Sequence, residues 1–436
     1  MRTIVLGAGV AGTLTAYHLL REGHEVTVVD RQPGAAMETS FANGGFMASS
    51  QAEPWAAPGV PLKILKWLGR EDAPLLLRPR VVPQMWRWGL RFLANCTEAR
   101  ALASGERSFK LAHYSIAVLK QVREDTQIAY DEVIKGCIRV YGSAEAIDAA
   151  EHFYAKLAPL GLNYRVLDAA GCVAIEPALG PSAAKFTGGL FFPDEESGDC
   201  HKFTQAIASV CQQGGAAFRY GTNVTALETS GGAINAIITD KGRLTADRYV
   251  VALGSYSPLL LRPLRIRLPI IPVKGYSITV PAAAWPGALT VPIADDERKF
   301  GLSRFGDLIR ASGSAEIAGY DTTPNEARAN GVLKSVTDLF PGFARCLDPA
   351  TNRVWCGLRP MTPDNPPVLG ASPYRNLFLN TGHGHMGWTF GCGAGKAVAA
   401  LVAGKMPDID LTGYALDRFA RRPTDRAPEK IADPVL

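Results

Sequence analysis

The 436-residue sequence lacks the features that mark membrane-spanning, secreted or nucleic-acid-binding proteins. No apolar run approaches the roughly 18 residues that a membrane-spanning helix requires. The apolar stretch at the N-terminus is interrupted by Gly7-Ala8-Gly9 and is too short for the core of a signal peptide. The net charge is only +5 and no long run of Lys and Arg occurs, which argues against nucleic-acid binding.

The cysteines are too dispersed to build a metal site. Zinc and iron–sulfur sites need clustered thiolates, whereas this sequence has no CxxC pair. The eight cysteines are Cys96, Cys137, Cys172, Cys200, Cys211, Cys346, Cys356 and Cys392. We therefore predict no metal, and we expect reduced thiols and a cytoplasmic location.

The composition is that of an ordinary globular protein. Hydrophobic residues make up 47% of the chain, and the length predicts two or three domains or one large core with insertions. We find no internal repeat. The polar, proline-containing segment 421–436 is expected to form a flexible tail.

The N-terminal segment has the pattern of half a dinucleotide-binding unit. An apolar strand, Thr3–Leu6, precedes the glycine-rich turn 7–12, and a helical pattern follows to about Glu22. A second strand, 25–29, ends in Asp30, which lies 18 residues beyond Gly12. This order of strand, turn, helix, strand and acid favours dinucleotide binding over a glycine turn without a ligand.

Each residue of this motif has a physical role in that interpretation. Gly7 permits the tight turn, Gly9 lets the backbone approach a pyrophosphate, and Gly12 lets the helix pack closely on the sheet. The phosphates then lie against free N–H groups at the helix N-terminus. Asp30 is placed to accept hydrogen bonds from the ribose hydroxyls. The motif alone does not distinguish a nicotinamide from a flavin.

The remaining chain alternates between helical and strand-like patterns. Helices are expected at 84–99, 106–126, 203–213 and 326–340, and strands at 216–220, 224–229, 233–239 and 249–253. Residues 266–280 and 299–320 are typical of antiparallel strands, with turns at Gly306-Asp307 and Gly313. A strand at 377–379, a glycine-rich turn at 381–387 and a helix to about Ala403 complete the pattern.

Several later segments carry a resemblance to a known family. They are 31–45, Pro54–Pro61, Glu195–Asp199, Leu253–Ser257, Val273-Lys274-Gly275-Tyr276-Ser277, Gly357-Leu358-Arg359-Pro360-Met361-Thr362-Pro363-Asp364 and Asn380-Thr381-Gly382-His383-Gly384. With the N-terminal motif, they make the chain resemble the FAD-dependent D-amino-acid dehydrogenases of bacteria, within the glycine oxidase and D-amino-acid oxidase superfamily. The resemblance extends from residue 1 to about residue 419.

The resemblance implies an α/β fold with two domains. A Rossmann-type FAD-binding domain is expected from residues 1–50, 185–265 and 355–420. An inserted substrate domain of mixed, largely antiparallel sheet is expected from 51–184 and 266–354.

The resemblance also implies non-covalent FAD and a set of residues around it. The expected contacts are Gly7, Gly9, Val10, Ala11, Gly12, Asp30, Arg31, Thr39, Ser40, Asn43, Gly44, Val224, Gly254, Gly382, His383, Gly384, Gly387, Trp388 and Thr389. The segment from Thr39 to Gly44 is expected to run along the pyrophosphate and approach the flavin. N–H groups at the second glycine-rich turn can stabilise negative charge on the reduced flavin. Cys356 is not interpreted as a covalent tether.

Arg359 is expected to bind the substrate, because in the superfamily the arginine of this motif holds the amino-acid carboxylate. A guanidinium matches a carboxylate with two parallel hydrogen bonds, which lysine cannot do. The alternative is a structural ion pair, for example with Asp364. Tyr276 is a second candidate for the carboxylate, although a tyrosine on a strand is often simply packed. His385 is a candidate pocket residue, and His383 and His385 alone are a poor basis for a metal site.

The implied reaction is oxidative deamination of a D-amino acid to a 2-oxo acid and ammonia, with hydride transfer from Cα to flavin N5. Relatives pass electrons to a quinone or another acceptor. Residues Leu75–Asn95 interleave Arg78, Arg80, Arg87 and Arg91 with apolar residues, which is typical either of a helix lying on the inner face of a membrane or of a core helix with a basic face.

Three alternatives remain open at this point. The substrate could be a secondary amine such as D-proline, hydroxy-D-proline or sarcosine, or could be glycine. A nicotinamide dehydrogenase would use the N-terminal motif equally well but would not require the second glycine-rich turn. An FAD-binding electron-transfer subunit would not require Arg359. Oligomeric state is not indicated by the sequence.

Overall fold

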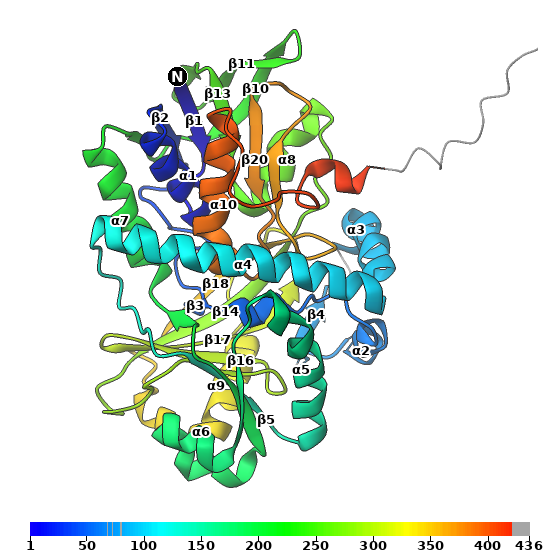
Figure 1. Cartoon of the computed structure of the whole chain (residues 1–436), viewed down its shortest axis with the longest axis vertical. Helices are drawn as coiled ribbons and strands as arrows, with labels where there is room; N and C mark the ends of the chain where they lie inside the picture. Colours follow the sequence, from blue (N-terminus) through cyan, green and yellow to red (C-terminus); the bar gives the residue numbers. More distant parts are fainter. Residues whose placement is uncertain (68, 72, 79–80, 421–436) are drawn as a thin grey trace, which may run out of the picture.

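The computed structural model describes residues 1–67, 69–71, 73–78 and 81–420; the expected tail and Arg80 lie outside these residues. Two large β-sheets organise the described chain (Figure 1). The long helix α4 (Glu98–Thr126) runs across the molecule between them in this view. The four helices expected from the sequence are present as α3 (Val82–Asn95), α4, α7 (Cys200–Gln213) and α9 (Glu326–Leu339).

The first sheet contains the N-terminal motif. Its six strands, in the order β19-β20-β13-β1-β2-β9, are Val368–Ala371, Leu377–Thr381, Arg248–Val251, Arg2–Leu6, Glu25–Val29 and Ala217–Arg219. All neighbouring strands are parallel except β19, which pairs with β20 in the antiparallel sense. Both faces of this sheet are covered by other elements, so its strands consist of nearly continuous apolar residues and do not alternate between apolar and polar residues.

Alternating side chains of this sheet enter two separate cores. Val5, Val28 and Val250 pack with α1 (Val10–Arg21), α7, α4 and α10 (Gly387–Val402). Ile4 and Val251 pack on the other face against β10 (Val224–Ser230), β11 (Ala233–Thr239) and α8 (Ser257–Leu261). The three-stranded sheet β10-β11-β12 is completed by β12 (Gly242–Leu244). Successive side chains along each strand point to opposite faces of the sheet, so the N-terminal motif lies in a sheet that is covered by one core on each face.

The second sheet is larger and mostly antiparallel. Its order is β18-β14-β17-β16-β15-β5-β7-β6, and β4 (Leu75–Leu77) pairs with β17. The eight strands of this path are Arg353–Met361, Ile271–Pro281, Leu308–Ile317, Phe300–Phe305, Ile293–Asp295, Cys137–Tyr141, Gly188–Phe192 and Arg165–Asp168. Helices α6 (Ala169–Ile175) and α9 pack against its lower part in Figure 1, where apolar residues of the strands form a third core.

Helices of the 60–157 region complete the described chain. Helix α2 (Val60–Trp67) is not among the helices expected from the sequence, and α5 (Ala144–Leu157) follows β5. Figure 1 shows α2 and α3 together at one edge of the molecule. No helix among the described residues has the length and apolar character to cross a bilayer.

Strand pairing bears on three details of the sequence prediction. β7 and β18 belong to the larger sheet, because β7 pairs with β5 and β6, and β18 pairs with β14. The expected domain boundaries at residues 185 and 355 stay a prediction; they place β7 and β18 in a different domain from the strands with which these two pair. The turn at Gly306-Asp307 is present between β16 and β17, but Gly313 lies inside β17 at an irregularity opposite Tyr276.

Candidate active site

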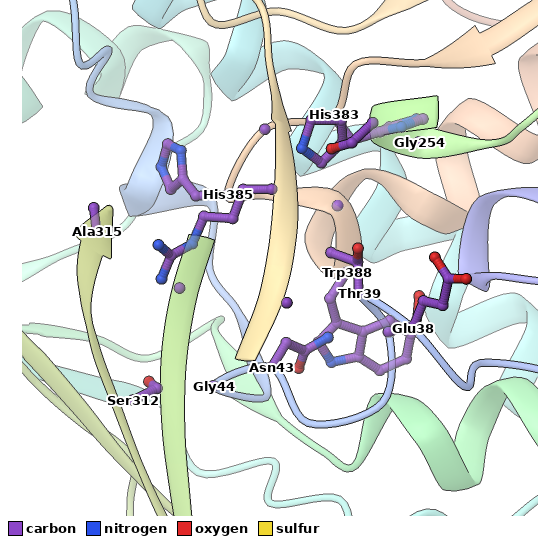
Figure 2. Close-up of a pocket in the computed structure, with 18 of the residues that line it drawn as sticks. Glu38, Thr39, Asn43, Gly44, Gly254, Ser312, Ala315, His383, His385 and Trp388 are labelled. Carbon is purple, nitrogen blue, oxygen red and sulfur yellow. The ribbon is translucent and has the colours of Figure 1, made fainter. Parts of the chain in front are cut away.

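A cavity of about 1240 Å³ lies between the two sheets and collects most of the predicted site residues. Its walls come from the N-terminal motif, the 37–46 segment, β14, β17, β18 and the second glycine-rich turn (Figure 2). Drug-sized ligands occupy roughly 300–1,000 Å³. The cavity is therefore large enough for a dinucleotide together with a small substrate.

One end of the cavity is formed by the N-terminus of α1. The helix begins at Val10 after Gly9, which has no side chain to cap it; the N–H of Val10 donates to the Ser40 hydroxyl at 3.2 Å. A Cβ on Gly12 would lie 1.9 Å from the Gly7 carbonyl oxygen, so Gly12 allows close packing. A Cβ on Gly9 would meet nothing closer than Ser40 Oγ at 3.5 Å. The space over Gly9 is thus left for a ligand that approaches the helix N-terminus.

Asp30 stands at the end of β2, beside this helix. Its carboxylate accepts hydrogen bonds from the N–H groups of Ala8 at 2.6 Å and Gln32 at 2.8 Å. Burial raises the pKa of this carboxyl group. The next residue, Arg31, pairs with Glu38 at 2.6 Å and lies 3.9 Å from the centre of the Tyr256 ring. These contacts hold Asp30 and Arg31 rigidly along the cavity wall.

The second glycine-rich turn forms another part of the wall. It leaves β20, adopts positive φ at Gly382 and Gly384, and enters α10 at Gly387. His383 Nε2 and Trp388 Nε1 are buried, and neither has a hydrogen-bond partner among the described residues. Burial lowers the pKa of His383 to about 4, so its imidazole is neutral at neutral pH. The wall therefore offers uncharged polar groups and a helix N-terminus to a ligand.

Three residues predicted to contact the cofactor do not line the cavity. They are Gly12, Gly382 and Thr389. Gly12 packs on the Gly7 carbonyl, and the Cα of Gly382 faces Ile270 and Thr362. The Thr389 hydroxyl donates to the Phe46 carbonyl and accepts from the Ala48 N–H, both at 3.3 Å. All three residues contact the backbone next to the cavity and thereby help to fix its shape. The other predicted cofactor residues line it directly.

Arg359 projects from β18 into the middle of the cavity. Its guanidinium donates to the Ser314 carbonyl at 3.0 Å and lies where a side chain on Gly275 would stand. No acidic residue in the described ranges forms an ion pair with Arg359. Asp364, the partner considered from the sequence, pairs instead with Arg418 at 2.8 Å. Burial lowers the pKa of Arg359 to about 10, which leaves it protonated at neutral pH.

The phenol of Tyr276 does not reach this guanidinium. Arg359 stands opposite Val273 in the β14–β18 register, whereas Tyr276 stands opposite Cys356, three residues away, so the two side chains point to opposite faces. The Tyr276 hydroxyl donates to Glu316 at 2.5 Å, and Glu316 also pairs with Arg78 and Lys274. The Tyr276 hydroxyl thus has an internal acceptor, although Tyr276 also lines the cavity, and its contact with the substrate carboxylate stays a prediction.

His385 lies near Arg359 on the cavity wall. Its Nε2 donates to the Gln51 carbonyl at 3.3 Å, and its ring stacks on Trp55 with centroids 5.6 Å apart. Burial, together with the charge of Arg359, lowers the pKa of His385 to about 4. The structure thus brings His385 and Arg359 into one cavity, with the imidazole uncharged. In the part of the chain that the structure describes, no cluster of acidic, histidine and cysteine residues could hold a metal ion.

Sequence reasoning missed a group of charged residues that line the cavity. They are Glu53, Arg139, Asp296 and Lys299, and Arg139 pairs with Asp296 at 2.7 Å. These residues come from three separate segments and form no local motif. Arg139 lies in β5, and Asp296 follows the end of β15. The pairing of β5 with β15 brings these two residues together.

Comparisons with known proteins agree with this geometry. Residues 2–401 match the DAO family model, described as FAD dependent oxidoreductase. The chain is 49% identical over 420 residues to a D-amino acid dehydrogenase of Paramagnetospirillum magneticum, covering 96% of this chain and 99% of that protein. It is 47% identical over 419 residues to a D-amino acid dehydrogenase of Sinorhizobium medicae, covering 96% and 100%.

Solved structures with the same fold are more distant in sequence. Glycine oxidase from Geobacillus kaustophilus has a TM-score of 0.74 at 21% identity, covering 96% of this chain and 99% of that chain. L-proline dehydrogenase from P. horikoshii has a TM-score of 0.74 at 17% identity, covering 96% and 97%. The α1 N-terminus that begins after Gly9, the open space at Gly9 and the size of the cavity fit a bound FAD. The chain therefore belongs to the DAO family of FAD-dependent oxidoreductases.

Proposed function

We propose that this protein is a D-amino-acid dehydrogenase, which oxidises the substrate to an imine that water converts to a 2-oxo acid and ammonia. One observation carries the proposal: among the described residues, Arg359 is a desolvated cation that no protein carboxylate pairs with, in the same cavity as the dinucleotide motif. A desolvated guanidinium is matched best by a ligand carboxylate. The names of the two full-length relatives support the choice of a D-amino acid.

The chain contributes orientation and electrostatics to this reaction. Arg359 holds the substrate carboxylate, which fixes the direction of the Cα–H bond, and such orientation supplies several kcal/mol of a barrier. When bound, FAD supplies the acceptor for the hydride that leaves Cα. His385 presents a neutral imidazole beside Arg359, so the carboxylate meets a single positive charge there. The substrate amine must be neutral, which makes the rate rise with pH.

An anaerobic absorbance titration tests the proposal. The purified holoprotein is mixed with matched D- and L-amino acids, with both prolines, sarcosine and glycine included. We expect D-enantiomers to bleach the flavin bands, and the order of rates ranks the substrates. Faster bleaching by secondary amines would assign the alternative substrate class, and a yellow protein that no amino compound bleaches would overturn the proposal.

We further propose that electrons leave to a membrane quinone or a similar acceptor, with the protein held on the inner face of the cell membrane. The α2–α3 surface, formed by α2 and α3, carries the supporting features. Its exposed apolar side chains, Leu62, Leu65, Trp86, Leu90 and Leu93, each expose half or more of their surface. Lys63, Lys66, Arg87 and Arg91 lie in the same two helices, which contain no acidic residue.

Apolar and basic side chains together suit an anionic lipid surface. Trp67 of α2 and Phe92 of α3 also line the cavity, so this surface borders the site where the flavin is reduced. A lipid-soluble acceptor would thus approach the cavity from the membrane side.

A further inference from the structure

The segment that passes the predicted flavin position is bonded to the larger sheet through three consecutive carbonyl groups. Ser277 Oγ donates to the Ala42 carbonyl at 2.6 Å, and Ser303 Oγ donates to the Gly44 carbonyl at 2.9 Å. Between them, the Arg310 guanidinium donates to the Asn43 carbonyl at 3.1 Å. We call Ser277, Ser303 and Arg310 the loop clamp.

The strand register places all three clamp side chains on one face of the larger sheet. Ser303 of β16 stands directly opposite Arg310 of β17. Thr279 of β14 also stands opposite Arg310, and Ser277 lies two residues before Thr279 on the same face. The Thr279 hydroxyl accepts a hydrogen bond from Arg310 Nε at 3.0 Å. The clamp is therefore a continuous patch on three adjacent strands.

The clamp residues are buried and held in place by further contacts. Ser277 is 1% exposed, Ser303 0% and Arg310 6%. The Arg310 guanidinium also pairs with Asp199 at 3.3 Å and lies 4.8 Å from the centre of the Phe305 ring. Asp199 caps α7 through the N–H groups of His201 and Lys202, so the clamp ties the loop to both halves of the fold.

Only glycines fit where the loop meets this patch. A Cβ on Gly44 would lie 2.5 Å from Ser312 Oγ. A Cβ on Gly45, whose φ is +77°, would lie 2.2 Å from the Phe305 ring. The loop backbone therefore lies directly on the sheet, without intervening side chains.

The orientation of the carbonyls determines where the N–H groups point. No peptide bond in the described residues is cis, so each N–H points away from the carbonyl of the preceding residue. The N–H groups of Asn43 and Gly44 thus point away from the sheet, and both residues line the cavity. The Gly45 N–H donates to Asn43 Oδ1 at 2.9 Å, whereas those of Asn43 and Gly44 have no protein acceptor within the described residues.

We propose that the loop clamp aims the N–H groups of Asn43 and Gly44 at the FAD and thereby favours the reduced cofactor. Fixed backbone donors stabilise negative charge without having to reorient during the reaction. Ser277, Ser303 and Arg310 are positioning residues, because they act through the loop. The inference rests on FAD as the cofactor but is independent of which amino compound is the substrate.

The test uses the holoproteins of Ser277→Ala, Ser303→Ala and the double variant. The midpoint potential of the bound flavin is measured by dithionite titration against reference dyes, which requires no substrate. We expect a more negative potential in each variant and the largest shift in the double variant. With a bleaching substrate, the limiting rate of flavin reduction should fall about threefold to tenfold per serine while substrate affinity changes less than twofold, since one lost hydrogen bond corresponds to about 1 kcal/mol.

Ser115→Ala is the matched control. Its hydroxyl is also buried and has one hydrogen bond with the backbone, accepted from the Gly393 N–H at 2.9 Å, but away from the loop. The control should match the single variants in thermal stability and leave the potential unchanged. Should either serine variant fail to fold with FAD, Arg310→Lys provides a further measurement on the same loop. A folded, FAD-containing double variant with the wild-type potential would overturn the inference, even if no D-amino acid proves to be a substrate.

Discussion

Arg418 holds the carboxylate of Asp364 with two hydrogen bonds, at 2.8 and 3.3 Å. Asp364 follows Arg359 by five residues and was the natural candidate for an internal partner. Because Arg418 takes that place, the Arg359 guanidinium remains available to a ligand carboxylate. The two arginines therefore have different roles.

Substitution should separate these roles. Arg359→Lys should weaken substrate binding about 100-fold, because breaking a buried hydrogen-bonded charge pair costs about 2–5 kcal/mol. FAD content and thermal stability should remain near wild type. Rapid-mixing titrations of flavin bleaching give the affinity. Arg418→Ala, in contrast, should lower the unfolding temperature, since it leaves Asp364 buried and unpaired. A wild-type substrate affinity in Arg359→Lys would show that the carboxylate binds elsewhere.

Tyr276→Phe should affect stability rather than catalysis. The substitution removes the donor to Glu316, which keeps Arg78 and Lys274 as partners. A hydrogen bond to a charged group contributes about 1.5–3 kcal/mol, so urea unfolding should show a loss of that order. Steady-state parameters should stay within about threefold of wild type, a change below 1 kcal/mol. A large rise in KM with unchanged stability would instead place Tyr276 in the substrate site.

The pH dependence of the reaction should report the substrate amine and not His385. The pKa of His385 is lowered to about 4, so this side chain stays neutral as the pH rises from 5 to 9. We expect kcat/KM to rise with pH until the bound amine is neutral, since only the neutral amine can release hydride. His385→Asn should lower the rate and leave the midpoint of the pH profile in place. A variant that loses the pH dependence would identify His385 as the base.

The same shift predicts an effect on stability in acid. The folded pKa of His385 lies below its ordinary value near 6.5, so the unfolded chain binds more protons between pH 6.5 and 4. The histidine's contribution is complete above pH 6.5 and is lost as the pH falls toward 4. The free energy of unfolding of His385→Asn should therefore depend less steeply on pH in this range than that of wild type, as measured by urea unfolding.

Alanine substitutions at two glycines of the N-terminal motif should have different effects, one on stability and one on FAD affinity. Gly12→Ala places a Cβ 1.9 Å from the Gly7 carbonyl oxygen and should destabilise the protein even without cofactor. Gly9→Ala meets only Ser40 Oγ at 3.5 Å, so the apoprotein should keep its stability while FAD affinity falls. Thermal unfolding of apoprotein and fluorescence titration with FAD distinguish the two. Equal loss of apoprotein stability in both variants would contradict the assignment of Gly9 to the ligand.

The α2–α3 surface can be tested with lipid vesicles. Leu65→Glu and Leu90→Glu should each lower binding to vesicles rich in phosphatidylglycerol about tenfold or more, since burying a leucine side chain gains about 1.5–3 kcal/mol. Met406→Glu is the control, because Met406 is 91% exposed in a different region. Flavin bleaching in solution should be unchanged in all three. Absence of wild-type binding to these vesicles would exclude a lipid role for the surface.

The sequence was most informative where one short segment carries both the structure and the site. The strand, turn, helix and acid from Thr3 to Asp30 are all present, and Gly9, Asp30 and Arg359 line one cavity. In these segments the site residues follow directly on the elements that position them, so residue type and spacing are sufficient.

Long-range pairing was the information that the sequence did not provide. Whether β7 and β18 join the larger sheet depends on partners far away in the chain. The face on which Tyr276 lies depends on the register with β18, and a shift of one residue would reverse it. The partner of Asp364 lies 54 residues away at Arg418, where no local pattern indicates it.

The strand order of the first sheet has a consequence for biosynthesis. β1, at residues 2–6, is separated from β20, at residues 377–381, by β13 alone, and α1 packs on α10, which ends at Val402. A ribosome must therefore release nearly the whole chain before the sheet can close and the nucleotide can be captured. Such non-local topology slows folding and leaves apolar strands exposed while synthesis continues. Flavin loading is then a late event in the biosynthesis of the protein.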